Sequence, residues 1–193
     1  AARPTAPVLS PSDLGGAKAL PGAEGDSADA AKNRGTRLHM LLEHLAPLDA
    51  ARRPATARAL LGPDPEAEAL LAEVLGVLDT PVLARFFAAS TLAEVAVTAD
   101  LPGLGRVHGV IDRLIVEDAT VLAVDFKSNR TVPDTPDKVP EGLLRQMGAY
   151  ATALAQVYPG RQIETGILWT ATAHYMPLPH ALVTQALDRA PTS

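Results

Sequence analysis

Leucines at helical spacing begin the regular part of the chain. From Asn33, the stretch NRGTRLHMLLEHLAPL places leucines three and four residues apart until Pro47, which predicts an amphipathic helix. The stretches 54–62, 63–81 and 81–88 also carry apolar residues at helical spacing, with prolines or acids near their starts. The pattern therefore predicts that the first half of the domain is helical.

The period changes to that of β-structure near residue 91. The stretch 91–99 alternates in polarity, and GRVHGVIDRLIVED (105–118) and TVLAVDFKS (120–128) are apolar and β-branched around a short turn. An amphipathic helix is predicted over 141–158, then one strand (QIETGILWTA) and a closing helix (PHALVTQALDRA). The predicted core stripe of the 141–158 helix is Leu143, Met147, Tyr150, Leu154 and Val157. This order predicts an α/β fold, a small mixed sheet flanked by helices with a helical region before it.

Residues 1–32 carry no such period. They are rich in Pro, Gly, Ala, Ser and Asp, which predicts a flexible lead-in or linker, with a single domain over 33–193. A chain of 193 residues is long enough for one domain with a real core. The linker-like start suggests a piece of a larger protein.

Charge and composition narrow the function classes. The net charge is −5, which argues against broad nonspecific nucleic-acid binding but leaves room for a small basic groove. The chain has no cysteine, which excludes disulfides, zinc–thiolate sites and iron–sulfur clusters. No apolar run has the length of a membrane span and no signal pattern begins the chain, so we expect a cytoplasmic protein without a membrane partner.

Two aspartates and a lysine stand among apolar strand residues. If the turn of the predicted hairpin centres on Asp118 and Ala119, Asp112 faces Asp125 across the strands, and Lys127 shares the face of Asp125. Two ionised carboxylates at this distance repel each other unless a cation lies between them. A hard divalent ion such as Mg²⁺ fits best, and the lysine can then act on a water or on phosphate charge.

Two other interpretations of these residues remain open. An arbitrary D-x-K is usually a salt bridge at a sheet edge. A hydrolase of another class, such as a glycosidase, also uses two carboxylates. The nearby lysine and an aromatic content of 4% argue against a sugar site.

Four motifs in order resemble the RecB-type nuclease domain of the PD-(D/E)XK superfamily. They are GTRLH (35–39), GVID (109–112), DFK (125–127) and QMGAY (146–150). The resemblance covers roughly residues 33–190 and implies a restriction-endonuclease-like fold that hydrolyses DNA phosphodiesters. It also leaves a non-catalytic DNA-binding or scaffold module as the alternative.

The resemblance implies a role for each matching residue. The catalytic residues would be Asp112, Asp125 and Lys127. The ligands of Mg²⁺, or of Mn²⁺ in its place, would be His39, Asp112, Asp125 and the main-chain carbonyl of Phe126. The residues on the substrate side would be Gln146 and Tyr150, which line the DNA side of the site, and Glu94 in a supporting role. Arg113 is expected on the opposite face of its strand, outside the site.

Within the superfamily, the chain is most similar to the C-terminal nuclease domain of AddA-type helicase–nuclease subunits. The absence of cysteine argues against the AddB type, which carries an iron–sulfur cluster. No phosphate-binding loop of the form GxxxxGK[ST] is present, so ATP would serve only a helicase part elsewhere in the full-length chain. The expected partners are DNA, that helicase part and an AddB-like subunit.

Overall fold

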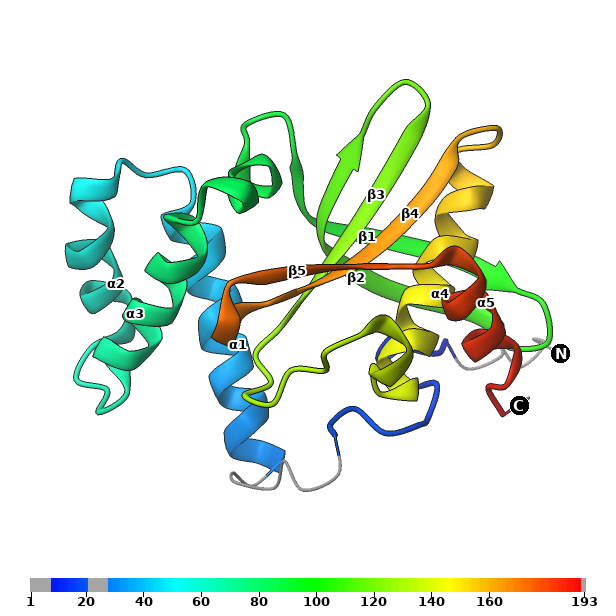
Figure 1. Ribbon diagram of the computed structural model, residues 1–193, viewed down its shortest axis with the longest axis horizontal. Helices are drawn as coiled ribbons and strands as arrows, with labels where there is room; N and C mark the ends of the chain where they lie inside the picture. The colour runs from blue at the N-terminus through cyan, green and yellow to red at the C-terminus, as the bar shows by residue number, and fades with distance from the viewer. Residues whose placement is uncertain (1–7, 21–27, 192–193) are drawn as a thin grey trace, which may run out of the picture.

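A single mixed sheet separates two groups of helices in the computed structural model, which describes residues 8–20 and 28–191 (Figure 1). The helices are α1 (Ala28–Leu45), α2 (Arg53–Leu61), α3 (Ala67–Leu78), α4 (Glu141–Val157) and α5 (His180–Asp188). The strands are β1 (Leu92–Leu101), β2 (Gly105–Val116), β3 (Thr120–Lys127), β4 (Gln162–Trp169) and β5 (His174–Leu178). Within the described residues, no helix is both long and apolar enough to span a membrane.

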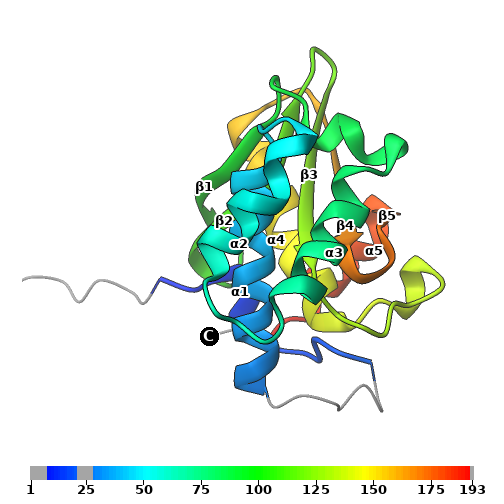
Figure 2. The same cartoon turned by 90° about the vertical axis from the view of Figure 1, so that its left-hand side faces the viewer.

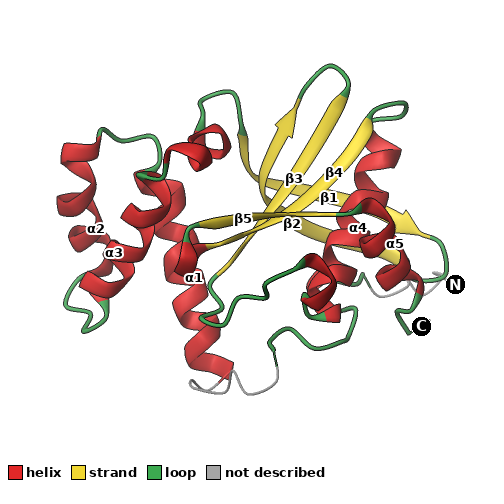
Figure 3. Ribbon diagram, viewed as in Figure 1, coloured by secondary structure: helices red, strands yellow, loops and turns green. Residues whose placement is uncertain are grey.

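The strands lie in the order β1-β2-β3-β4-β5. Neighbouring strands are antiparallel except β3 and β4, which are parallel and joined through α4. This mixed sheet with helices on both sides confirms the predicted restriction-endonuclease-like α/β fold (Figure 3).

The two faces of β3 pack into different cores. Leu122, Val124 and Phe126 join α1, α2 and α3, whereas Val121 and Ala123 join α4 and α5. Figure 2 shows α1 and α2 on the near side of the strands and α4 beyond them. Because side chains alternate along a strand, Asp125 and Lys127 project to the same side as Val121 and Ala123, toward α4.

Most predicted elements are present, with four corrections. β5 was not predicted, and the helix expected over 81–88 is a 3-10 helix over Pro81–Phe87. Val157, expected in the core stripe of α4, is 54% exposed because it lies in the last turn. The lead-in predicted for 1–32 is wrong for two stretches.

Those two stretches are residues 8–20 and 28–32. Leu14 is buried in the core, and the main-chain N–H of Leu9 donates to the carbonyl of Arg106 at 2.9 Å. Residues 28–32 form the first turn of α1 rather than a linker. For residues 1–7 and 21–27, the lead-in prediction lies outside the described residues.

Candidate active site

Three carboxylates lie at one level across β1, β2 and β3. Ala93 pairs with Arg113 and Val95 with Ile111, so Glu94 lies opposite Asp112 between those two pairs. On the other side of β2, Arg113 pairs with Val124, which confirms the predicted hairpin register next to Asp112 and Asp125. Acids on three adjacent strands therefore share one row of the sheet.

Glu94 departs from regular strand geometry in that row. Its φ is 49°, in the left-handed region, which costs an L-residue roughly 1–2 kcal/mol. Burial, together with the negative charge of Asp112, raises the pKa of Glu94. A cation in this row would offset the repulsion between Glu94 and Asp112.

His39 reaches the same row from α1. Its Nδ1 lies 3.2 Å from Oδ1 of Asp112, and its Nε2 lies 3.0 Å from the carbonyl oxygen of Phe126. Both partners are acceptors, so a neutral imidazole can donate to only one of them. Burial lowers the pKa of His39, but the hydrogen bond to Asp112 and the charges of Asp112 and Asp125 outweigh it and raise the pKa. The surroundings of this imidazole therefore attract positive charge.

The donor set fits a divalent cation. One ligand atom from each of His39, Glu94 and Asp112 lies within 4.8 Å of the others, and the Phe126 carbonyl is adjacent to His39. Two carboxylates, a carbonyl and one imidazole form the oxygen-rich set that hard divalent ions prefer. Glu94, expected in a supporting role, thus belongs to the group that could hold the ion, while Asp125 lies beside this group.

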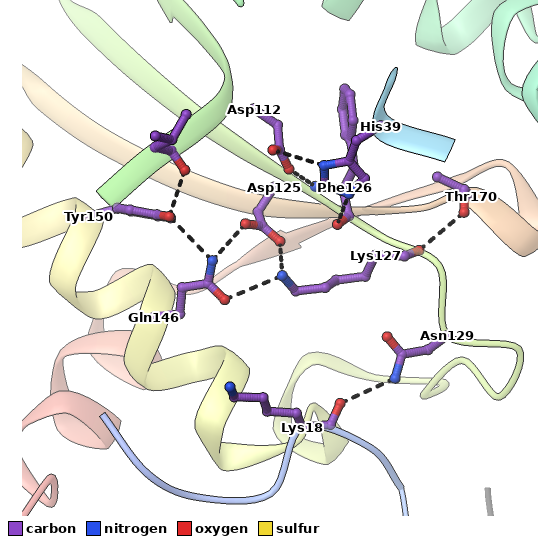
Figure 4. A network of polar contacts seen from close by, with 11 residues as sticks. Lys18, His39, Asp112, Asp125, Phe126, Lys127, Asn129, Gln146, Tyr150 and Thr170 are labelled. Atoms are coloured by element: carbon purple, nitrogen blue, oxygen red, sulfur yellow. Dashed lines mark hydrogen bonds and ion pairs between the residues drawn. The ribbon is translucent and has the colours of Figure 1, made fainter. Parts of the chain in front are cut away.

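Lys127 lies beside the cation group, held by two side chains (Figure 4). Its Nζ is 2.5 Å from Oδ2 of Asp125 and donates to Oε1 of Gln146 at 3.3 Å. The Gln146 amide donates to Oδ1 of Asp125 at 2.8 Å. Burial raises the pKa of Asp125, and the ammonium of Lys127 opposes that shift. The network fixes a cation and a buried carboxylate next to the row of acids.

Tyr150 anchors the far end of this network. Its hydroxyl accepts from the Gln146 amide at 3.3 Å and donates to the carbonyl of Val110 at 2.7 Å. The ring is 3% exposed, and burial raises the pKa of the phenol. Tyr150 therefore orients Gln146 from within the core, and the hydroxyl holds the strand that carries Asp112.

An open cleft of about 820 Å³ lies beside the site and is bordered by His39, Glu94, Phe126, Lys127 and Gln146. Its walls come from α1, from the segment before α1, from residues 127–129 and from the start of α4. Gly35 forms part of the α1 wall one turn before His39, and a Cβ there would lie 3.3 Å from Oγ of Ser128. The glycine of the GTRLH motif thus lets the loop after Lys127 approach α1.

The structure brings the predicted site residues together. His39, Asp112, Phe126 and Glu94 meet at the cation group, and Asp125, Lys127, Gln146 and Tyr150 form the adjoining network. Arg113 is turned away, with its guanidinium 5.3 Å from the ring centre of Phe87, as expected.

Known proteins, including the following two, resemble parts of the chain. Over 62 residues, 32% of this chain, the sequence is 32% identical to an ATP-dependent helicase/nuclease subunit of Oenococcus oeni (strain ATCC BAA-331 / PSU-1). That match spans 5% of the length of the relative. The solved crystal structure of SSO0001 aligns over 81% of this chain and 83% of its own, at 14% identity and a TM-score of 0.36.

The chain also matches a protein family over most of its length. The sequence model of the PD-(D/E)XK nuclease superfamily matches residues 14–190, nearly the whole chain and every residue of the site described above. The chain belongs to the PD-(D/E)XK nuclease superfamily.

Proposed function

We propose that this chain is the metal-dependent deoxyribonuclease module of an AddA-type helicase–nuclease, which processes DNA double-strand breaks for recombinational repair. The observation that carries the proposal is the cation group of His39, Glu94 and Asp112 next to the held ammonium of Lys127. The short match to a helicase/nuclease protein supports the AddA type.

The reaction is hydrolysis of a DNA phosphodiester. Water adds to phosphorus, the bond to one deoxyribose oxygen breaks, and the products are a phosphate monoester and a hydroxyl. One water proton ends on the leaving oxygen and the other goes to solvent. A divalent ion, Mg²⁺ or Mn²⁺ in our proposal, supplies neutralisation of the phosphate charge when it is bound.

The residues of the chain have separate proposed roles in ion binding, charge stabilisation and positioning. His39, Glu94, Asp112 and the Phe126 carbonyl would hold the ion, and Asp125 is the proposed further ligand from the next strand. Lys127 would place an ammonium where negative charge develops on the phosphate, and a positive group held in position there stabilises the transition state. Gln146 keeps Lys127 and Asp125 in position through its two hydrogen bonds.

Single variants separate ion binding from chemistry. We expect Mg²⁺- or Mn²⁺-dependent cleavage of a labelled oligonucleotide that EDTA abolishes. Lys127→Ala should lower the rate by roughly 10²–10³-fold while calorimetry still detects Mn²⁺ binding. Asp112→Asn should lose both cleavage and Mn²⁺ binding. Asp118→Asn, in the exposed turn of the same hairpin, should keep both properties. Equal cleavage in excess EDTA would refute the metal-dependent mechanism.

The proposed AddA type can be tested separately from the nuclease activity. The AddA proposal places an ATP-driven motor elsewhere in the full-length protein and an AddB-like partner beside it. Purification of the full-length protein from its source should then recover ATP-dependent unwinding and a second protein with a nuclease fold. If the full-length protein lacked ATPase activity, the AddA type would be contradicted and the nuclease assignment would stay intact.

A further inference from the structure

Three of the chain's four lysines line the same cleft. The lysines are Lys18, Lys32, Lys127 and Lys138, and the first three border the cleft around the cation group. Lys127 belongs to the network with Asp125. Lys18 and Lys32 lie on the segment before α1 and near the start of α1, and the mechanism above does not use them.

Neither the Lys18 amine nor the Lys32 amine is held closely by a carboxylate of the described residues. Arginines on this acidic chain are commonly held by carboxylates, as Arg58 is by Glu68 at 2.7 Å. The Lys18 amine, in contrast, is 3.7 Å from Asp13, at the limit of an ion pair, and both side chains are more than half exposed. No carboxylate of residues 8–20 or 28–191 is paired with the amine of Lys32. Both amines are therefore available to an anion in the cleft.

Main-chain contacts fix the wall that carries Lys18. The N–H of Gly142 donates to the carbonyl of Ala17 at 2.8 Å, and the Asn129 amide donates to the carbonyl of Lys18 at 3.1 Å (Figure 4). A Cβ on Gly142 would lie 2.7 Å from that Ala17 oxygen, so only glycine allows this close approach. The backbone at Lys18 is therefore held between the start of α4 and the loop that follows β3.

Charged side chains of both signs line the cleft. Glu94 lies in the cation group, and Glu43 is one helical turn beyond His39 on α1. Lys32 precedes His39 by two turns, roughly 10 Å at the rise of an α-helix. Glu94 and Glu43 thus lie at or near the cation group, whereas Lys32 lies away from it and Lys18 borders the cleft together with Asp13.

We propose that Lys18 and Lys32 bind phosphates of the DNA backbone next to the scissile one, and that residues 8–20 form part of the substrate site. The proposal rests on the proposed function and adds two binding residues to it. Lysine acts on phosphate as a point charge, so these contacts add affinity without base preference.

Salt dependence tests the two lysines directly. A labelled single-stranded oligonucleotide is titrated by anisotropy in EDTA at several salt concentrations. Each phosphate contact contributes about 0.7 to the slope of log affinity against log salt, so Lys18→Gln and Lys32→Gln should each reduce the slope by about that amount. Lys18→Arg should restore the slope, and Lys138→Gln, outside the cleft, should leave it at the wild-type value. In cleavage assays the loss should fall on KM rather than on kcat.

Two glycine substitutions test whether the position of residues 16–18 affects DNA binding. Gly142→Ala must displace the carbonyls of Gly16 and Ala17, at 2.8 and 2.7 Å from the new Cβ, and should lower the salt slope as Lys18→Gln does. Gly76→Ala, inside α3 with nothing within 4 Å of its added Cβ, should not. Adding Lys18→Gln to Gly142→Ala should give no further loss, because both changes remove the same contact.

The outcomes are distinguishable. Wild-type slopes and KM in both lysine variants would overturn the proposal while nuclease activity stands. Lysine-dependent binding without metal-dependent cleavage would overturn the nuclease function and keep the anion site. A wild-type protein that does not bind the oligonucleotide would overturn the site itself.

Discussion

Gly109 lies directly against the ring of Tyr150. A Cβ on Gly109 would be 3.0 Å from Cε1 of Tyr150 and 2.7 Å from Cγ of Pro11. The first residue of GVID and the last residue of QMGAY are thus two sides of one contact. This contact sets the distance between β2, which carries Asp112, and α4, which carries Gln146.

Gly109→Ala should therefore destabilise the fold. Overpacking at a closed contact typically costs about 1–3 kcal/mol, which urea unfolding would detect as a lower midpoint at unchanged slope. Gly76→Ala is the control, and an open helical site should gain up to about 1 kcal/mol from alanine. A Gly109→Ala protein as stable as wild type would show that Pro11 and Tyr150 can move aside.

Glu94→Gln should weaken binding of Mn²⁺. The change removes one of two carboxylates from the cation group, and we expect a loss of roughly one to two orders of magnitude in affinity by calorimetry. Glu43→Gln is a matched control, because Glu43 borders the same cleft outside that group. An equal loss in both variants would indicate general electrostatic attraction instead of ligation.

Binding of Mn²⁺ should strengthen as the pH rises. The pKa of His39 is raised in the folded protein, so stability from its bound proton is full below the ordinary value of 6.5 and is lost as pH rises through the raised value. A divalent ion competes with that proton, because a histidine ligand must be neutral. Affinity should therefore increase with pH above 6.5 and level off once His39 is neutral. His39→Asn should bind more weakly with a flatter pH profile, and an unchanged profile would contradict this role.

Glu73→Ala should destabilise the protein and loosen the site. Glu73 on α3 pairs with Arg34 of α1 and accepts from the hydroxyl of Thr170 at 2.5 Å, and that hydroxyl also reaches the carbonyl of Lys127 at 3.3 Å. The ion pair is nearly buried, so removal of Glu73 would leave the Arg34 charge without its partner. The free energy of unfolding, measured in urea, should therefore fall by about 3 kcal/mol.

The same helix offers a control for that change. Glu68 on α3 forms an exposed pair with Arg58, and exposed pairs contribute little. Glu68→Ala should therefore unfold like wild type. A Glu73→Ala protein that matched it would show that the pair with Arg34 is not needed for stability.

The hydrophobic pattern predicted the helices and four of the five strands because each has several turns or alternations. It missed β5 because HYMPL is five residues long and contains Pro177, which is tolerated there since β5 is an edge strand. It also missed the docking of residues 8–20, which depends on Leu9, Pro11 and Leu14. Three apolar residues without a period leave no sequence signal.

The sequence predicted the arrangement of those candidate site residues that lie in the motifs. The register of the hairpin followed from turn position and alternation, which placed Asp112, Asp125 and Lys127. The position of Glu94 opposite Asp112 could not be predicted from the sequence, because it depends on the pairing of β1 and on the φ of 49° at Glu94 itself. Lys18 could not be placed from sequence, since its wall is built by main-chain contacts to Gly142 and Asn129.

The uneven lengths of β2 and β3 have a practical consequence. Only Arg113–Val116 of β2 pairs with β3, and near the start of β2 that edge is covered by Leu9, which bonds to the main chain of Arg106 and His108. A polypeptide trimmed to begin at α1 would expose these N–H and C=O groups, and bare strand edges recruit other chains. Such a shortened protein should self-associate and precipitate during purification, so expression boundaries are best placed before Leu9.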